Sequence, residues 1–113
     1  MKLLLKSQEM KLWANSKASA ANTIGDIDYF PVVKFFNPCG AGTWLISEMD
    51  KDGLMFGLCD LGNGCPELGY VSFDELESIQ LPFGLKIERD MYWEADKYLS
   101  EYASAARAAG GIV

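Results

Sequence analysis

Short apolar runs separated by turn residues occupy the middle of the chain and predict β-strands. The runs are rich in Val, Ile, Phe, Tyr and Trp, which suit a pleated backbone. Gly, Pro, Asn and Asp fill the connections, and Asp52-Gly53 is typical of a tight hairpin turn. Because most of these connections are short, we expect an antiparallel meander. Its strands are predicted at residues 30–36, 43–49, 54–60, 67–72 and 85–93.

A helical repeat of apolar positions is found near the N-terminal end, in residues 7–24. Ser7 is the expected cap and Gly25 the expected stop. The apolar face is shallow because it is rich in alanine, so Trp13 is its main anchor. Such a face leaves two arrangements open, a helix packed on the domain or a helix that peels away from it. The face comprises Met10, Trp13, Ala14, Lys17, Ala20, Ala21 and Ile24.

Two further helices are predicted towards the C-terminal end. A capping box, serine followed three residues later by glutamate, predicts a short helix after Ser72. Its inward positions are Leu76 and Ile79, and Pro82 is its expected stop. An alanine-rich repeat predicts the last helix at residues 97–109, with Gly110 beyond its end. The apolar stripe of this helix consists of Leu99, Tyr102, Ala103 and Ala106.

These elements predict an α+β fold: a small antiparallel β-meander of about five strands, with N- and C-terminal helices and one short helix after Ser72. A chain of 113 residues has the size of one domain and can bury a core without metal or disulfide. We expect residues 1–25 to form the N-terminal helical segment and residues 26–113 to form a single α+β domain.

The sequence also indicates a cellular compartment. The apolar run near the start of the chain is too short for a secretion signal. No stretch approaches the roughly 20 apolar residues of a membrane span, so no membrane contact is expected. The cysteines, Cys39, Cys59 and Cys65, are an odd number for a disulfide framework. We therefore expect reduced thiols and a cytoplasmic location.

Charge is distributed unevenly along the chain, whose net charge is −6. Residues 1–24 hold four lysines against Glu9, whereas residues 48–77 hold eight acids against Lys51. An acidic body of this kind argues against a nucleic-acid-binding face. The candidate binding residues are the eight acids, Glu48, Asp50, Asp52, Asp60, Glu67, Asp74, Glu75 and Glu77.

The absence of histidine limits the candidate chemistry. Ser-His-Asp and Cys-His catalytic arrangements and histidine metal ligands are excluded. Cys59 lies in an apolar run beside Asp60, where burial and a neighbouring anion both raise the pKa of a thiol. We therefore expect Cys59 to be structural. The cysteines also lack Cys-x-x-Cys spacing, and we assign no catalytic residue, metal or cofactor.

Five segments of the chain form a specific combination. They are Pro31-Val-Val-Lys-Phe-Phe36, Thr43-Trp-Leu-Ile46, Phe56-Gly-Leu-Cys-Asp-Leu-Gly62, Pro66-Glu-Leu-Gly-Tyr-Val-Ser72 and Ile87-Glu-Arg-Asp90. With these segments the chain resembles a family of short bacterial proteins of unknown function, found on plasmids, integrated elements and phages, chiefly in proteobacteria. The resemblance spans nearly the whole chain. It implies a genomic setting but no catalytic residue.

Three hypotheses about function follow. The preferred one is a non-catalytic accessory protein of a mobile genetic element that binds another protein, whose identity the sequence does not indicate. In an anti-restriction version, the acids between Glu48 and Glu77 imitate the charge of DNA in a nuclease's basic site. The first alternative is a metal-dependent enzyme that uses turn carboxylates such as Asp60 and Glu67. The second is a nucleic-acid accessory domain that uses Lys2, Lys6, Lys11 and Lys17.

Overall fold

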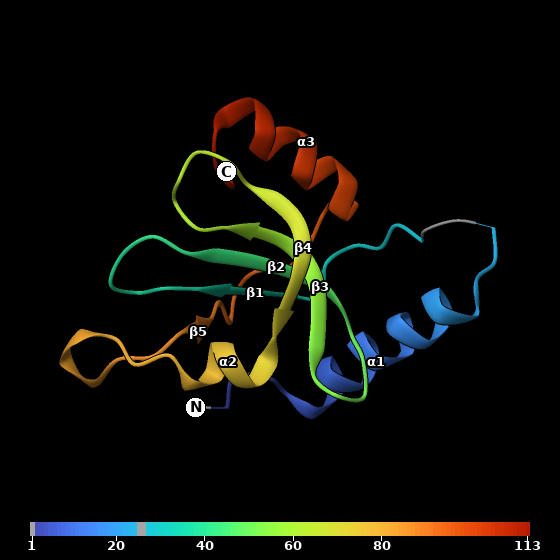
Figure 1. Cartoon of the computed structure of the whole chain (residues 1–113), viewed down its shortest axis with the longest axis horizontal. Coiled ribbons are helices and arrows are strands. Elements are labelled where there is room, and N and C mark those ends of the chain that lie inside the picture. The colour runs from blue at the N-terminus through green and yellow to red at the C-terminus, as the bar shows by residue number, and fades with distance from the viewer. Residues whose placement is uncertain (1, 25–26) are drawn as a thin grey trace.

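Five antiparallel strands form one sheet in the order β4-β3-β2-β1-β5, with helices on both of its faces (Figure 1). The structure is a computed structural model that describes residues 2–24 and 27–113. The described strands are β1 (Val33–Phe36), β2 (Thr43–Met49), β3 (Leu54–Asp60), β4 (Glu67–Ser72) and β5 (Glu88–Arg89). The described helices are α1 (Lys6–Ala21), α2 (Phe73–Ser78), the 3-10 turn η1 (Pro82–Gly84) and α3 (Leu99–Ala109). The predicted α+β fold is confirmed.

Three predicted strands, β2, β3 and β4, are confirmed residue for residue. The first strand is shorter than predicted, since β1 starts at Val33. Pro31 explains part of the difference, because proline has no N–H to donate to a ladder. Phe30 lies outside the strand and packs edge-on against Tyr98, with ring centroids 4.8 Å apart. This contact ties the segment before β1 to the segment that enters α3.

The last strand is also shorter than predicted. It comprises Glu88–Arg89, where residues 85–93 were expected, because its pairing with β1 extends over two residues only. The predicted alternation holds for Ile87, which is buried. It fails for Leu85 and Met91, which are exposed. Only the middle of this alternating segment therefore faces the core.

The helix α1 packs on the sheet, but not through the predicted face. Leu12 is fully buried, and Asn15 donates from Nδ2 to the carbonyl oxygen of Ser47 at 2.9 Å. Met10 and Trp13, which were expected to be buried, are 59% and 47% exposed. An alanine-rich face buries too little apolar surface to compete with one leucine and a buried hydrogen bond. The prediction that Trp13 anchors the helix is therefore wrong.

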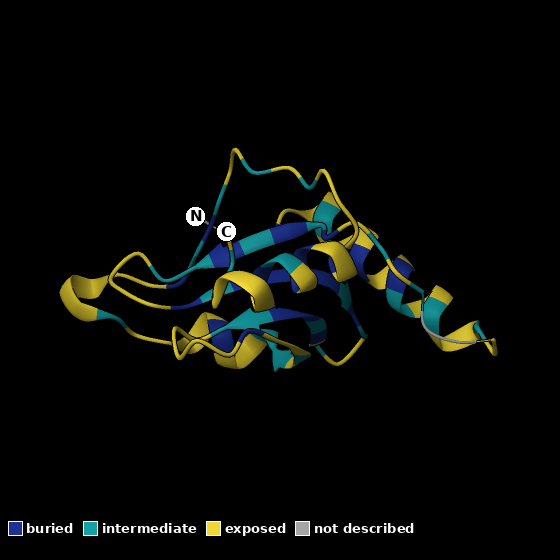
Figure 2. Cartoon of the chain, turned by 90° about the horizontal axis from the view of Figure 1, so that it is seen from above, coloured by how far each residue is buried: buried dark blue, intermediate teal, exposed yellow. Residues whose placement is uncertain are grey.

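The ends of α1 differ from the prediction as well. The N-cap is Leu5 rather than Ser7, and the backbone N–H of Leu5 donates to the Gln8 side chain at 3.0 Å. Beyond Asn15 most of the helix is exposed or half-buried as it extends past the sheet (Figures 1 and 2). The helix ends at Ala21 with Asn22 as its C-cap, before the predicted end at Ile24, so the prediction that it continues to a stop at Gly25 is wrong. Gly25 itself and the boundary between residues 25 and 26 lie outside the described residues.

The short helix α2 begins as predicted. The hydroxyl oxygen of Ser72 accepts a hydrogen bond from the backbone N–H of Glu75 at 3.3 Å. Leu76 faces the core, as expected, and is 1% exposed. Ile79 does not, because it lies beyond the last helical residue with an extended backbone and is partly exposed. The helix therefore ends before Pro82, its expected stop.

The prediction for the last helix is largely confirmed. α3 begins at Leu99 rather than at residue 97, and Gly110 ends it with a left-handed backbone, φ 80°. Glycine adopts this conformation without the steric cost that a Cβ brings. The predicted stripe is buried: Leu99, Tyr102, Ala103 and Ala106.

The sheet has one core on each face, and Figure 2 shows the buried parts of the strands and helices in dark blue. The larger core lies beneath α1, α2 and the N-terminal segment and comprises Leu3, Leu4, Leu12, Val33, Phe35, Trp44, Ile46, Met49, Met55, Leu76 and Ile87. The smaller core lies beneath α3 and comprises Leu45, Leu58, Leu99, Tyr102, Ala103 and Ala106. Among the residues that the structure describes, no helix combines the length and apolar character needed to cross a membrane.

A buried arginine holds the N-terminal segment in place. Arg89 is 7% exposed, and its Nη1 group donates to the carbonyl oxygens of Lys2 and Leu3, each at 2.9 Å. The next residues, Leu3 and Leu4, are buried in the larger core. The segment that precedes α1 is therefore held against β5 by these hydrogen bonds.

We expect Arg89→Met to lower the free energy of unfolding by about 2–4 kcal/mol, because two carbonyl oxygens lose a charged donor in a buried site. Urea denaturation measures this change. Arg107→Met is the matched control, since Arg107 is exposed in the last turn of α3 and its loss should cost no more than about 0.5 kcal/mol. Equal stability of the two variants would contradict the anchoring role.

Candidate functional site

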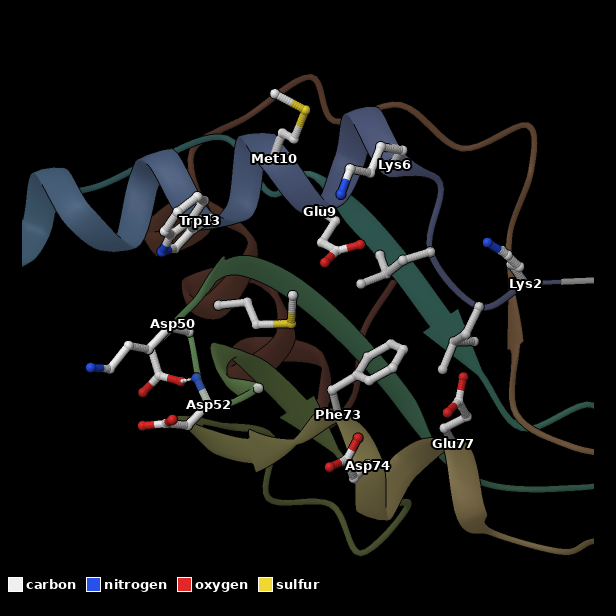
Figure 3. A pocket seen from close by; sticks show the side chains of 15 residues that line it. Lys2, Lys6, Glu9, Met10, Trp13, Asp50, Asp52, Phe73, Asp74 and Glu77 are labelled. Carbon is white, nitrogen blue, oxygen red and sulfur yellow. Dashed lines mark hydrogen bonds between the residues drawn. The ribbon is translucent and has the colours of Figure 1, made fainter.

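An open groove with a volume of about 820 Å³ lies between the N-terminal segment, α1, the β2–β3 turn and α2 (Figure 3). Each wall comes from a different part of the chain. The turn contributes residues 49–53, and the first helix contributes Lys6, Glu9, Met10 and Trp13. The hydrogen bonds of Arg89 and Asn15 and the buried residues Leu3, Leu4 and Leu12 hold two of these walls against the sheet.

Four of the eight candidate binding residues line this groove. Asp50 and Asp52 lie on the turn, and Asp74 and Glu77 lie on α2, below the turn in Figure 3. Glu9 adds a fifth carboxylate from α1. The lining cations are fewer: Lys2, Lys6 and Lys51. The groove therefore carries an excess of negative charge.

Local structure explains where these carboxylates lie. The Oδ1 atom of Asp50 accepts from the backbone N–H groups of Asp52 and Leu54, each at 2.9 Å, which closes the turn. Gly53 completes the turn with φ 84°, a left-handed conformation that favours glycine. Asp74 lies in the first turn of α2, where negative charge suits the helix dipole. Asp50 is thus mainly structural, while Asp52 extends from a fixed position.

The same groove contains apolar surface. Leu3, Leu4 and Met49 are buried residues that line it, as does Phe73, the first residue of α2. Met10 and Trp13 are exposed along α1. The Nζ atom of Lys17 lies 4.6 Å from the centroid of the Trp13 ring, so one ring face already has a cation.

The remaining acids lie outside the groove. The Asp60 carboxylate accepts from the backbone N–H groups of Gly62 and Ile112, each at 2.9 Å, and so fastens the C-terminal segment to β3. Glu67 opens β4, paired with Cys59 near the far end of β3. Glu48 lies in β2, paired with Phe56, and Glu75 is exposed on α2. The acidic run from 48 to 77 is therefore divided between the two ends of β3.

The turn carboxylates do not form a metal-binding cluster within residues 2–24 and 27–113. No three His, Cys, Asp or Glu side chains of these residues are placed to hold a metal ion. Asp60 and Glu67, which the enzyme hypothesis requires, are separated in the fold from Asp50 and Asp52 by the length of β3. The Asp60 carboxylate also already accepts a hydrogen bond from the backbone N–H of Ile112 in the C-terminal segment.

The three cysteines are free thiols in different surroundings. Cys39 and Cys65 are exposed on loops. Cys59 is partly buried in β3 and packs against the larger core. Burial raises the pKa of the Cys59 thiol, in the direction expected from the sequence.

Sequence reasoning missed the apolar part of the groove. Trp13 and Met10 were assigned to the buried face of the first helix, and Phe73 received no role. The signal that predicts the correct face is Leu12, the only leucine of α1, because one branched aliphatic side chain selects a helix face more strongly than several alanines. With Leu12 buried, Met10 and Trp13 are left exposed, and both are among the residues that line the groove.

The chain belongs to the family described as a protein of unknown function (DUF2958), whose model matches residues 3–113. Comparison with curated proteins and with solved structures gives no significant match. The predicted resemblance to a full-length family of unknown function is therefore confirmed, and the genomic setting stays a prediction.

We expect Asp60→Ala to lower the free energy of unfolding by about 1–2 kcal/mol, since two backbone donors lose a carboxylate acceptor. Glu67→Ala, at an exposed position of the same sheet end, should change stability by less than about 0.5 kcal/mol. Thermal or urea unfolding distinguishes the two. An unchanged Asp60→Ala protein would show that the carboxylate does not hold the C-terminal segment.

We expect iodoacetamide to modify Cys39 and Cys65 faster than Cys59 at pH 8. The raised pKa of Cys59 leaves less thiolate at that pH, and the thiolate is the reacting form. Mass spectrometry of timed samples measures each rate, and denaturation in urea should make the three rates similar. Equal rates in the folded protein would contradict the burial of Cys59.

Proposed function

We propose that this protein is a non-catalytic accessory protein that acts by binding another protein through the groove between α1, the β2–β3 turn and α2. The observation that carries the proposal is the composition of this groove, an apolar floor bordered by five carboxylates. The residues that we propose to contact the partner are Asp52, Asp74 and Glu77, together with Met10 and Trp13.

Protein recognition accounts for both parts of the groove. Aromatic residues and methionine are enriched where proteins contact each other, and Trp13 and Met10 line the groove and are exposed. The excess of carboxylates favours a partner segment that carries lysine or arginine, because complementary charge directs encounter and orientation. The expected partner is therefore a basic protein segment with an apolar side chain at its centre.

The anti-restriction role is the more specific form of this proposal. A nuclease or another DNA-processing enzyme has a basic site of the required chemistry. The proposal includes the genomic setting that the family resemblance implies, plasmids and phages in the cytoplasm of a bacterial host, where such a partner is present. The division of the acids between the two ends of β3 favours a compact contact at the groove over imitation of DNA along the whole run.

The nucleic-acid alternative has less support. Two of the four lysines, Lys2 and Lys6, line the groove among carboxylates, and Lys17 lies over the Trp13 ring. These lysines do not form a surface separate from the acidic one. We therefore do not propose DNA or RNA as the ligand.

The test is affinity capture from the native host with wild-type protein and with Asp52→Lys, Glu77→Lys and Glu94→Lys. Glu94 is exposed and does not line the groove, and each substitution changes the charge by the same amount. We expect one stoichiometric protein partner, whose affinity falls about fivefold or more in each groove variant and is unchanged in Glu94→Lys.

Binding should also weaken as salt is raised, because exposed charges are screened. Thermal unfolding checks that each variant remains folded. Capture of the same partner with equal affinity by all three variants would contradict the groove as the recognition surface.

A further inference from the structure

The outer edge of β4 is open. β4 is the first strand of the sheet and, among the described residues, pairs along all six positions with β3 alone. The backbone N–H and C=O groups on its other side therefore point away from the sheet and can pair with an added strand. The opposite edge strand, β5, is only two residues long and offers no comparable template.

Exposed apolar side chains lie next to this edge. Tyr70 is 70% exposed, and its ring lies 5.1 Å from that of Phe56 on the neighbouring strand. Leu68 and Leu54 are exposed on the same face of the sheet, which α3 covers only in part. On the other face, Gly69 has no neighbouring atom within 4 Å of the place where a side chain would begin. Both faces beside the edge are therefore accessible to a further strand.

Most of the usual protections of an edge strand are missing from β4, whose one charged residue is Glu67. Natural edges carry lysine, proline or a bulge, or are very short, and these features prevent pairing with other chains. β4 has six residues without lysine or proline, and the described bulge lies in β2, between Ile46 and Glu48. An unprotected edge of this length beside apolar side chains favours strand addition.

Charge selects the strand that would be added. Residues 52–85 contain six acids and no lysine or arginine. Glu67 lies at one end of β4, and Asp74 and Glu75 follow its other end. An antiparallel second copy would place its own Glu67 near Asp74 and Glu75 at each end, and like charges across strands are unfavourable. A segment with basic residues at both ends meets opposite charge instead.

We propose that the free edge of β4 binds an extended, basic segment of a partner protein by strand addition, with its apolar side chains against Tyr70 and Leu68. Backbone hydrogen bonds supply most of the affinity, and the aromatic and charged residues select the segment. Glu67, Leu68 and Tyr70 do not line the groove, whereas Asp74 does, so this surface differs from the groove but meets it at Asp74.

The probe is a synthetic peptide of alternating Val and Thr with lysines at both ends. We expect it to bind the intact protein and to slow amide hydrogen exchange within residues 67–72. Tyr70→Ser should weaken binding about tenfold and Glu67→Lys about threefold to fivefold, whereas Tyr70→Phe should preserve it. A peptide of equal charge with proline at alternate central positions should not bind, because it lacks the donors for a ladder.

Three results would overturn the proposal. The first is the absence of binding or of protection in β4. The second is equal binding of the two peptides, which would indicate charge attraction alone. The third is concentration-dependent self-association that Tyr70→Ser abolishes, which would make a second copy the occupant.

Asp52→Lys separates this proposal from the groove. The variant should leave peptide binding at β4 unchanged, because Asp52 lies on the β2–β3 turn in the groove. Binding that Asp52→Lys removes, with protection of residues 49–53 rather than 67–72, would refute the β4 site and support the groove. The groove variants can lose capture of the native partner and still bind the peptide. That result would support the groove and would leave the β4 site intact.

Discussion

The hydrogen bonds of Arg89 join the N-terminal segment to β5 and hold in place the part of the chain from which α1 and the groove follow. The guanidinium group donates to the carbonyl oxygens of Lys2 and Leu3, across sequence separations of 87 and 86 residues. A cation in a buried site is stable only when its donors are satisfied, and these carbonyls satisfy part of that requirement. In return, the N-terminal segment is held over the larger core, where Leu3 and Leu4 fill space.

The position of α1 follows from this anchor, and the groove follows from α1. The helix is fastened by Leu12 and by polar contacts, the amide of Asn15 to Ser47 and the Tyr29 hydroxyl to the carbonyl of Asn15 at 2.8 Å. Because these groups hold one face, Trp13 and Met10 remain exposed on another. Because hydrogen bonds contribute to the docking of this helix, its largest apolar side chains can stay exposed and are accessible to a partner.

The path of the sheet decides how the acidic residues are used. Acids that are close in sequence are carried to opposite ends of β3 as the chain reverses direction at each turn. The acids near the β2–β3 turn and on α2 line the groove together with α1. The Asp60 carboxylate instead accepts a hydrogen bond from the C-terminal segment, and Glu67 lies at one end of the open edge of β4. Both proposed surfaces are acidic and partly apolar, so both select basic protein segments, although they differ in the backbone geometry that they recognise.

Local patterns were sufficient for the elements whose structure is decided by neighbouring residues. Turn residues and alternation predicted the bounds of β2, β3 and β4, Ser72 predicted the start of α2, and Gly110 predicted the end of α3. The face of α1, the length of β5 and the separation of Asp60 from Asp50 depend instead on contacts between distant segments. No local period encodes the carbonyls that Arg89 binds or the donors that Asp60 accepts, because those partners are brought together only by folding. The sequence alone thus determined the α+β meander and its excess of acid, and the tertiary structure decided which acids and aromatic residues share a surface.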